Sequence, residues 1–209
     1  MKMNMNLFPI LRFSFIYAIF TATLTAQVLP NSNLANSKSQ SIVDSQAVFD
    51  DICLGEAHKI VSDKLRKCKL LELAVNEVYL GRLGLNGSYR TVKTIGGLKC
   101  LLFFDWDDAS NLKELTMQTQ PQSVSSYDGL LNSTWRELTN LLTELYGKPL
   151  QSADYPASSK LQNDMSLSTH IWRHPSGGTV LLGTSKSTDG YMVVVRFTTE
   201  VIQPVIIKK

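Results

Sequence analysis

The sequence contains few of the residues that catalysis and metal binding use most often. Its 209 residues include three histidines and three cysteines, and neither a glycine-rich phosphate loop nor a G-x-S-x-G nucleophile motif is present. His170 and His174 have the HxxxH spacing, but their neighbours favour a strand, where four residues span about 13 Å and two imidazoles cannot share one ion. We therefore predict no metal site, no cofactor and no catalytic residue.

The chain also lacks a large excess of charge of either sign. It carries 21 Lys and Arg against 18 Asp and Glu. The first 26 residues hold two of these cations, Lys2 and Arg12, and no acid, so the remainder has 19 basic and 18 acidic residues and a net charge of +1. Because no basic run occurs, we predict that nucleic acid is not a partner.

Long apolar runs are absent except near the N-terminus. Residues 13–20 are apolar apart from Ser14, follow Lys2 and Arg12, and precede small residues that end in Ala26. This order is typical of a cleaved signal peptide. We predict a signal over 1–26, export to the periplasm or extracellular space, and no transmembrane span after its removal. The alternative is an uncleaved anchor over 7–24, which Arg12 leaves short for a bilayer.

The three cysteines cannot all pair with one another, so at least one is free or pairs between molecules. Cys53 and Cys68 flank a predicted helix, and 15 residues of helix rise about 22 Å, too far for a bridge. An exported protein can hold disulfides, which leaves two pairings open, Cys68 with Cys100 or Cys53 with Cys100. The alternative is that all three are small buried thiols.

Apolar periodicity predicts two helices and several strands. Residues 56–67 carry their apolar side chains on one helical face, and so do residues 134–145. Thr134 and Glu137 have capping-box spacing, and Gly147 marks the C-terminal stop of the second helix. Asn86-Gly87 predicts a two-residue hairpin turn. The predicted strands cover 77–85, 88–95, the two arms of a central hairpin over 98–119, 167–173, 179–183 and 191–199. Residues 48–54 are either a short strand or an ordered approach to the domain.

This order of elements predicts an α+β fold, an antiparallel β-sheet with helices packed on one face. Helix-then-strands occurs twice along the chain, which suggests a duplicated unit. We expect a flexible leader over 27–47, a single α+β domain over 48–200 with candidate halves 48–120 and 121–200, and a tail over 201–209.

Three short patterns are similar to those of small bacterial envelope proteins. Residues 52–55 read ICLG before a helix, residues 145–149 read LYGKP at the end of a helix, and Trp172, Gly178 and 180–182 form a W…G…VLL strand pair. The chain resembles β-lactamase-inhibitor-protein-like modules and the small outer-membrane assembly lipoproteins, although it lacks the lipoprotein Cys after the signal. The resemblance implies an α+β module that binds other envelope proteins, and it carries over no catalytic residue.

Aromatic residues on loops are the best candidates for contact with a partner. Trp106 lies at the predicted hairpin tip, Asp107 follows it in the turn, and Tyr155 lies in a long loop. Trp and Tyr are common at the centres of protein interfaces. We therefore predict an exported, non-catalytic protein-binding module of the bacterial envelope or extracellular space.

Two other functions stay open at this point. One is a small secreted hydrolase that uses Asp105 or Asp107 with His170 or His174, which requires the fold to bring them together. The other is a protein that holds a small ligand in or against its sheet.

Overall fold

The computed structural model describes residues 46–77, 80 and 84–204. The predicted signal peptide and all but the last two residues of the predicted leader lie outside the described residues. So do residues 205–209 of the predicted tail, and residues 78, 79 and 81–83.

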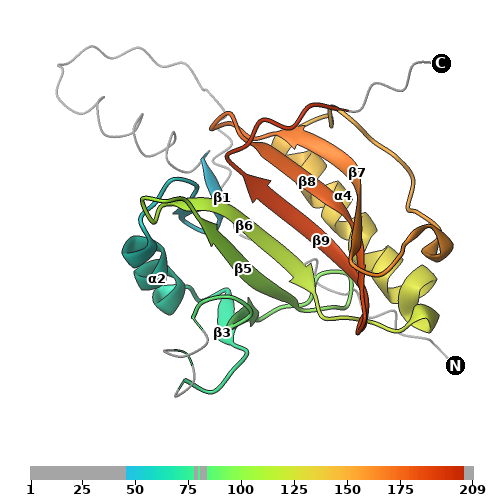
Figure 1. Cartoon of the computed structure of the whole chain (residues 1–209), viewed down its shortest axis with the longest axis horizontal. Helices are drawn as coiled ribbons and strands as arrows, with labels where there is room; N and C mark the ends of the chain where they lie inside the picture. The colour runs from blue at the N-terminus through green and yellow to red at the C-terminus, as the bar shows by residue number, and fades with distance from the viewer. Residues whose placement is uncertain (1–45, 78–79, 81–83, 205–209) are drawn as a thin grey trace, which may run out of the picture.

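A seven-stranded antiparallel sheet forms the centre of the molecule, in the order β3-β4-β5-β6-β9-β8-β7 (Figure 1). A separate two-stranded sheet pairs β1 (Ala47–Phe49) with β2 (Ile52–Cys53). The strands of the large sheet are β3 (Leu71–Leu73), β4 (Tyr89–Thr91), β5 (Cys100–Trp106), β6 (Leu112–Thr119), β7 (Met165–Arg173), β8 (Thr179–Ser187) and β9 (Gly190–Thr198).

Two α-helices, α2 (His58–Lys67) and α4 (Asn132–Tyr146), pack on one face of this sheet. Their buried side chains belong to the same core as the inward residues of the strands. In Figure 1, α4 lies behind β7, β8 and β9. Short helical turns complete the described elements: η1 (Val124–Ser126), the π-helical turn η2 (Tyr127–Leu131) and η3 (Ser158–Lys160). The fold is therefore α+β, as the sequence predicts.

Strand register divides the sheet residues into a covered face and an open face. Leu102 and Phe104 on β5 are 0% and 4% exposed, whereas their neighbours Leu101 and Phe103 are only half-buried. Because side chains alternate along a strand, cross-strand partners share a face. The covered face therefore continues across the sheet through Leu115, Met117, Val195, Phe197, Val180, Leu182 and Trp172.

The centre of the sheet joins strands from the two candidate halves. β6 and β9 pair in antiparallel register, with Leu115 opposite Phe197 and Met117 opposite Val195. All four of these side chains are buried on the covered face. The two segments of the chain therefore share one sheet and one core.

The predicted hairpin around Asn86-Gly87 is wrong. Tyr89 on β4 pairs with Leu73 on β3, so the connection runs over residues 74–88. Gly87 has a φ of +68°, but Asn86 is not in the left-handed region that a two-residue turn also requires at its first position. Instead, the Asn86 Oδ1 accepts a hydrogen bond from the Phe104 N–H at 2.6 Å.

The strand predicted over 77–85 is not found where the structure describes the chain. Glu77 and Leu80 are helical, and five of the nine residues lie outside the described part. The strand that pairs with β4 lies earlier, at Leu71–Leu73. Two glycines at 81 and 84 weaken the β-propensity of the predicted segment, which fits its loss.

The predicted capping box at Thr134 and Glu137 is also wrong. The π-helical turn η2 leads directly into α4, so the N-cap residue is Leu131 and makes no side-chain cap bond. Thr134 Oγ1 and the Ile95 carbonyl oxygen are 3.1 Å apart, and Glu137 Oε2 accepts the Gly96 N–H at 2.5 Å. The two residues fasten the 95–97 turn to α4.

Most other predicted elements are confirmed. These are the two helices, the hairpin of β5 and β6, and the three strands β7, β8 and β9. Gly147 ends α4 with a φ of +75°. None of the helices in the described part of the chain has the length and apolar character needed to cross a bilayer.

Candidate functional site

Among the residues that the structure describes, no helix crosses one of the two faces of the sheet. In Figure 1, α4 lies behind the sheet, so the viewer looks onto this open face. We define the open face by two rows of cross-strand neighbours on β5, β6 and β9. They are Leu101, Gln118 and Val194 in one row, and Phe103, Thr116 and Arg196 in the next.

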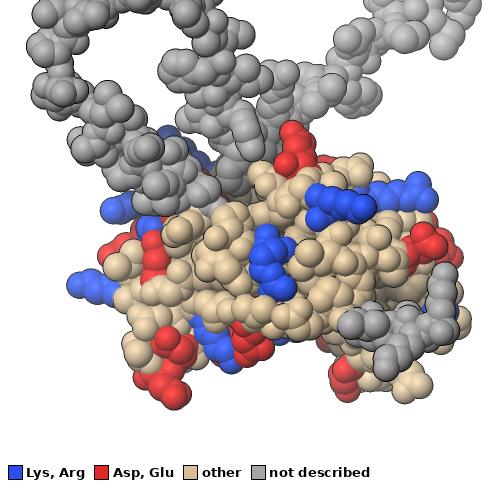
Figure 2. All heavy atoms as spheres, turned by 90° about the horizontal axis from the view of Figure 1, so that it is seen from above, with Lys and Arg blue, Asp and Glu red and all other residues tan. Residues whose placement is uncertain are grey.

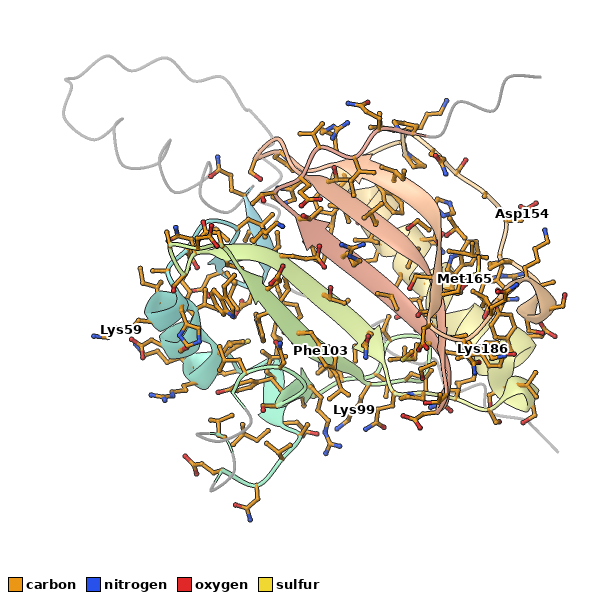
Figure 3. The ribbon with its side chains drawn as sticks, viewed as in Figure 1. Lys59, Lys99, Phe103, Asp154, Met165 and Lys186 are labelled. Carbon is orange, nitrogen blue, oxygen red and sulfur yellow. The ribbon has the colours of Figure 1, made fainter. Side chains whose placement is uncertain are left out.

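Apolar side chains lie half-buried in the middle of the open face. Leu101, Phe103 and Val194 keep part of their surface in water. The Phe103 ring is 3.4 Å from the position that a Cβ on Gly87 would occupy, so one edge of the ring rests on the 84–88 loop. Figure 3 places Phe103 near the middle of the molecule, well away from Lys59 on α2. Strand residues that face water are usually polar, so this apolar centre is unusual.

A bidentate ion pair fixes one charged group on the open face. Arg196 Nη2 and Nε donate to Glu114 Oε2 and Oε1 at 2.6 and 2.9 Å, and Thr116 Oγ1 donates to Glu114 Oε1 at 3.0 Å. The Glu114 carboxylate raises the pKa of Arg196 through these hydrogen bonds. A fork-to-fork pair of this kind holds the guanidinium in one orientation.

A second charged cluster borders the first row. Arg90 lies opposite Leu101, and its Nε is 2.7 Å from Glu72 Oε1, which also accepts from Lys99 Nζ at 2.7 Å. Hydrogen bonds from Lys99 and Arg90 lower the pKa of Glu72. Elsewhere, Lys and Arg side chains are interspersed with Asp and Glu side chains on the face shown in Figure 2.

Trp106 and Asp107 have structural contacts at the turn between β5 and β6. The Trp106 ring is half-buried, 4.5 Å from the His58 ring and 6.1 Å from the Phe104 ring. Asp107 Oδ1 accepts the N–H groups of Asn111 and Ala109 at 2.8 and 2.9 Å, and these bonds lower the pKa of Asp107.

Tyr155 lies in a different part of the molecule from Trp106. Its ring is 4.9 Å from that of Tyr127 and 5.4 Å from that of Trp135 on α4. In Figure 3, Asp154, the residue before Tyr155, lies at the opposite end of the molecule from Lys59 on α2. The structure therefore does not bring the predicted binding residues into one site.

The carboxylates and imidazoles of the hypothetical hydrolase are also apart. Asp105 is exposed at the end of β5, whereas His170 and His174 on β7 are 6% and 1% exposed. Four strand-to-strand steps separate β5 from β7, about 19 Å at the usual spacing. His170 lies between the rings of Trp135 and Trp172, at 5.4 and 5.3 Å. These residues cannot act together as an acid–base pair.

The three cysteines are free thiols in the structure. Cys100 is 1% exposed in the core, and burial raises its pKa to about 12. Burial also raises the pKa of Cys68, to about 11, and that of Cys53. Neither Cys68–Cys100 nor Cys53–Cys100 is bridged, and both pairings stay predictions. The described residues contain no group of three or more His, Cys, Asp and Glu side chains arranged to hold a metal ion.

A hollow of about 420 Å³ lies where the N-terminal end of α4 meets the 154–157 segment. We call it the aromatic hollow and define it by Asp128, Trp135, Arg136, Asp154, Tyr155 and Pro156. The sequence analysis placed Tyr155 in a long loop and did not connect it with Trp135, so it missed their contact. The only indication of this contact in the sequence is that both segments contain aromatic residues. The π-helical turn that aligns the two segments has no recognisable sequence pattern.

A second hollow, of about 370 Å³, lies between α2 and the turn after β1, beside Asp50, Asp63 and Lys64.

Comparison with known proteins gave no significant match to this chain, whether to a family model, to a curated protein or to a solved structure.

Proposed function

We propose that this protein is an exported, non-catalytic protein-binding module of the bacterial envelope or extracellular space, and that it binds a different folded protein through the open face. The observation that carries the proposal is the half-buried apolar centre of that face, formed by Leu101, Phe103 and Val194. Burying these side chains against a partner removes apolar surface from water, which favours association.

The accessible part of the open face lies on β5, β6 and β9. In the row of Arg196, the cross-strand neighbours Leu181 on β8 and Ile171 on β7 are only 4% and 3% exposed. A partner that binds the open face would therefore contact β5, β6 and β9 and the residues that border them.

The charged side chains around the apolar centre favour specific binding of one partner over non-specific hydrophobic association. Arg196 is held by Glu114 while its side chain remains 44% exposed. An arginine that is already ordered loses little conformational entropy on binding, and arginines are frequent among the residues that dominate binding energy. The envelope-module resemblance of the sequence is consistent with this function.

Affinity capture from an envelope extract, with the chain from Gln27 tagged at its C-terminus, tests the proposal. We expect the wild-type chain to capture one partner that stays bound at high salt. The Phe103→Asp variant should capture at least tenfold less of this partner. Val124→Asp is the matched control, because Val124 is 61% exposed on η1 and lies outside the sheet. Equal capture by both variants would overturn the site.

The identity of the occupant is tested separately by sedimentation of the purified chain. A monomer that binds the captured protein one to one supports the proposal. A homodimer that Phe103→Asp dissociates would show that the open face joins two copies of this chain, and the proposal would be wrong. Intact-mass measurement of the exported protein tests the signal, since cleavage after Ala26 leaves Gln27 as the first residue.

A further inference from the structure

We propose that the aromatic hollow binds a small organic ammonium ion, which lies in the corner formed by the rings of Trp135 and Tyr155, close to the carboxylates of Asp128 and Asp154. This site is separate from the open face and goes beyond the proposed protein-binding function. Four features of the hollow support the proposal.

The walls of the hollow are aromatic and fixed. The rings of Trp135 and Tyr155 are 5.4 Å apart and inclined at 59°, so they form two sides of a corner. Trp135 Nε1 donates to Thr169 Oγ1 at 2.9 Å, and the Tyr155 hydroxyl donates to the Tyr127 carbonyl oxygen at 3.0 Å. An ammonium ion is attracted to the face of an aromatic ring, and a wall that is already ordered does not lose entropy when the ion binds.

The rim of the hollow has more negative than positive charge. Asp128 and Asp154 contribute two carboxylates, and Arg136 contributes one guanidinium. In the described part of the chain, no cationic group lies within 4 Å of either carboxylate, so neither charge is neutralised by an ion pair. The net charge of the rim is therefore negative, which favours a cation over an anion.

The negative charge acts at the aromatic wall itself. Burial raises the pKa of Tyr155 most, the neighbouring Tyr127 raises it further, and the Asp128 carboxylate makes a smaller contribution in the same direction. Asp128 lies on the π-helical turn η2, one residue after Tyr127, whose carbonyl oxygen accepts the Tyr155 hydroxyl. A single extra residue in a helical turn shifts the side chains that follow, and such turns are frequent at functional sites.

The dimensions of the hollow restrict the ligand to a small one. Its volume of about 420 Å³ is at the lower end of the range for ligand sites. An ammonium group on a short apolar stem fits this space. Both a free amine and the side chain of a lysine carry this chemistry, and different probes separate the two sources.

The test is a titration of the ¹⁵N-labelled chain from Gln27, followed through its indole N–H signals at low ionic strength. The probes are choline, n-butylammonium as a match for the lysine side chain, and 3,3-dimethyl-1-butanol as a neutral isostere of choline. We expect the Trp135 signal to shift to saturation with Kd on the order of 1 mM for the better ammonium probe. The Trp172 signal, from a fully buried ring, serves as an internal reference.

Charge variants should change Kd in opposite directions, depending on the sign of the charge that is removed. A folding defect would weaken binding in every variant. Asp128→Asn and Asp154→Asn should each raise Kd at least threefold, whereas Arg136→Gln should lower it, since removing the guanidinium makes the rim more negative. Glu144→Gln on the same helix is the matched control. Equal shifts with the neutral isostere, no saturable shift up to about 20 mM, or the reversed order of the charge variants would each overturn the proposal. Phe103→Asp should leave this Kd unchanged, which keeps the test independent of the open face.

Discussion

Tyr127 and Tyr155 each donate a hydrogen bond to the backbone of the segment that contains the other. The Tyr155 hydroxyl donates to the Tyr127 carbonyl oxygen at 3.0 Å, and the Tyr127 hydroxyl donates to the carbonyl oxygen of Pro156, the residue after Tyr155, at 2.9 Å. These reciprocal bonds fasten the 154–157 segment to the π-helical turn. They position the wall of the aromatic hollow.

Removing either hydroxyl should weaken this connection. We expect Tyr127→Phe and Tyr155→Phe each to lower the free energy of unfolding by about 1 kcal/mol, the usual loss for a buried hydrogen bond. The two effects should not add, because both bonds join the same two segments. Urea unfolding of the single and double variants measures the coupling, and strictly additive losses would contradict it.

Gly96 is required by a close backbone approach as well as by its φ. A Cβ at this position would lie 2.3 Å from the Thr134 Cα, on the helix that holds the 95–97 turn. We expect Gly96→Ala to lower the free energy of unfolding by more than about 3 kcal/mol. Gly55→Ala is the control, because Gly55 also has a positive φ of +84° but has no atom within 4 Å of its Cβ position. It should cost only about 1–2 kcal/mol, the conformational penalty alone.

Two neighbouring phenylalanines on β5 test the assignment of the sheet faces. Phe104 is 4% exposed on the covered face, and Phe103 is half-buried on the open face. Phe104→Ala should cost about 3–5 kcal/mol, because it leaves a cavity in the core. Phe103→Ala should cost about 1 kcal/mol. Denaturant unfolding of the two variants measures both changes. An equal decrease in the free energy of unfolding would mean that the open face is covered.

Stability should decrease in mild acid because two histidines are buried in the neutral form. Burial lowers the pKa of His170 and of His174 below the ordinary value of 6.5. Below pH 6.5 the unfolded chain therefore binds more protons than the folded chain, and stability falls with pH until the folded-state pKa values are reached. His174 Nδ1 also accepts the Ser176 N–H at 3.2 Å, which requires an unprotonated nitrogen.

Thermal unfolding between pH 7.5 and pH 5 measures this dependence. We expect Tm to fall steadily below pH 6.5 in the wild type. The fall should be smaller in His170→Phe, since one of the two titrating groups is then absent. A flat profile in the wild type would contradict the buried, neutral state of both rings.

The thiols should react slowly in the folded protein. Burial raises the pKa of Cys100 to about 12 and that of Cys68 to about 11, and the thiolate is the reactive form. We expect Cys100 to react with a thiol reagent at pH 8 only after unfolding. Counting thiols in the unfolded, unreduced protein tests the predicted disulfides: three thiols mean no bridge, and one thiol means that either Cys68–Cys100 or Cys53–Cys100 has formed.

The elements predicted correctly are those whose apolar pattern is long and whose ends carry a physical signal. α4 has a strong apolar face and ends at Gly147, and β5 is a nearly continuous apolar strand. In each case the local pattern and the tertiary environment require the same conformation.

The predictions that are wrong rest on residues whose side chains make contacts with distant parts of the chain instead of the local contacts that their spacing indicates. Thr134 and Glu137 have the spacing of a capping box but bond to the 95–97 turn, 38 or more residues away. Asn86 precedes a glycine, as in a hairpin turn, but caps the backbone of Phe104. No short-range rule contains these partners, so the single sequence could not reveal them. The aromatic hollow was missed for the same reason, because it joins two segments that are 18 residues or more apart.

The position of β9 determines how the chain can assemble. β9 is the last of the described strands along the chain, yet it lies between β6 and β8 in the middle of the sheet. Until residues 190–198 are available, β6 and β8 each expose an unpaired edge, and the closing pair spans more than 70 residues of chain. Non-local closure of this kind is slow. A nascent chain would therefore leave both edges unpaired until residues 190–198 have been made, and an incompletely folded chain of this kind is compatible with the export that we propose.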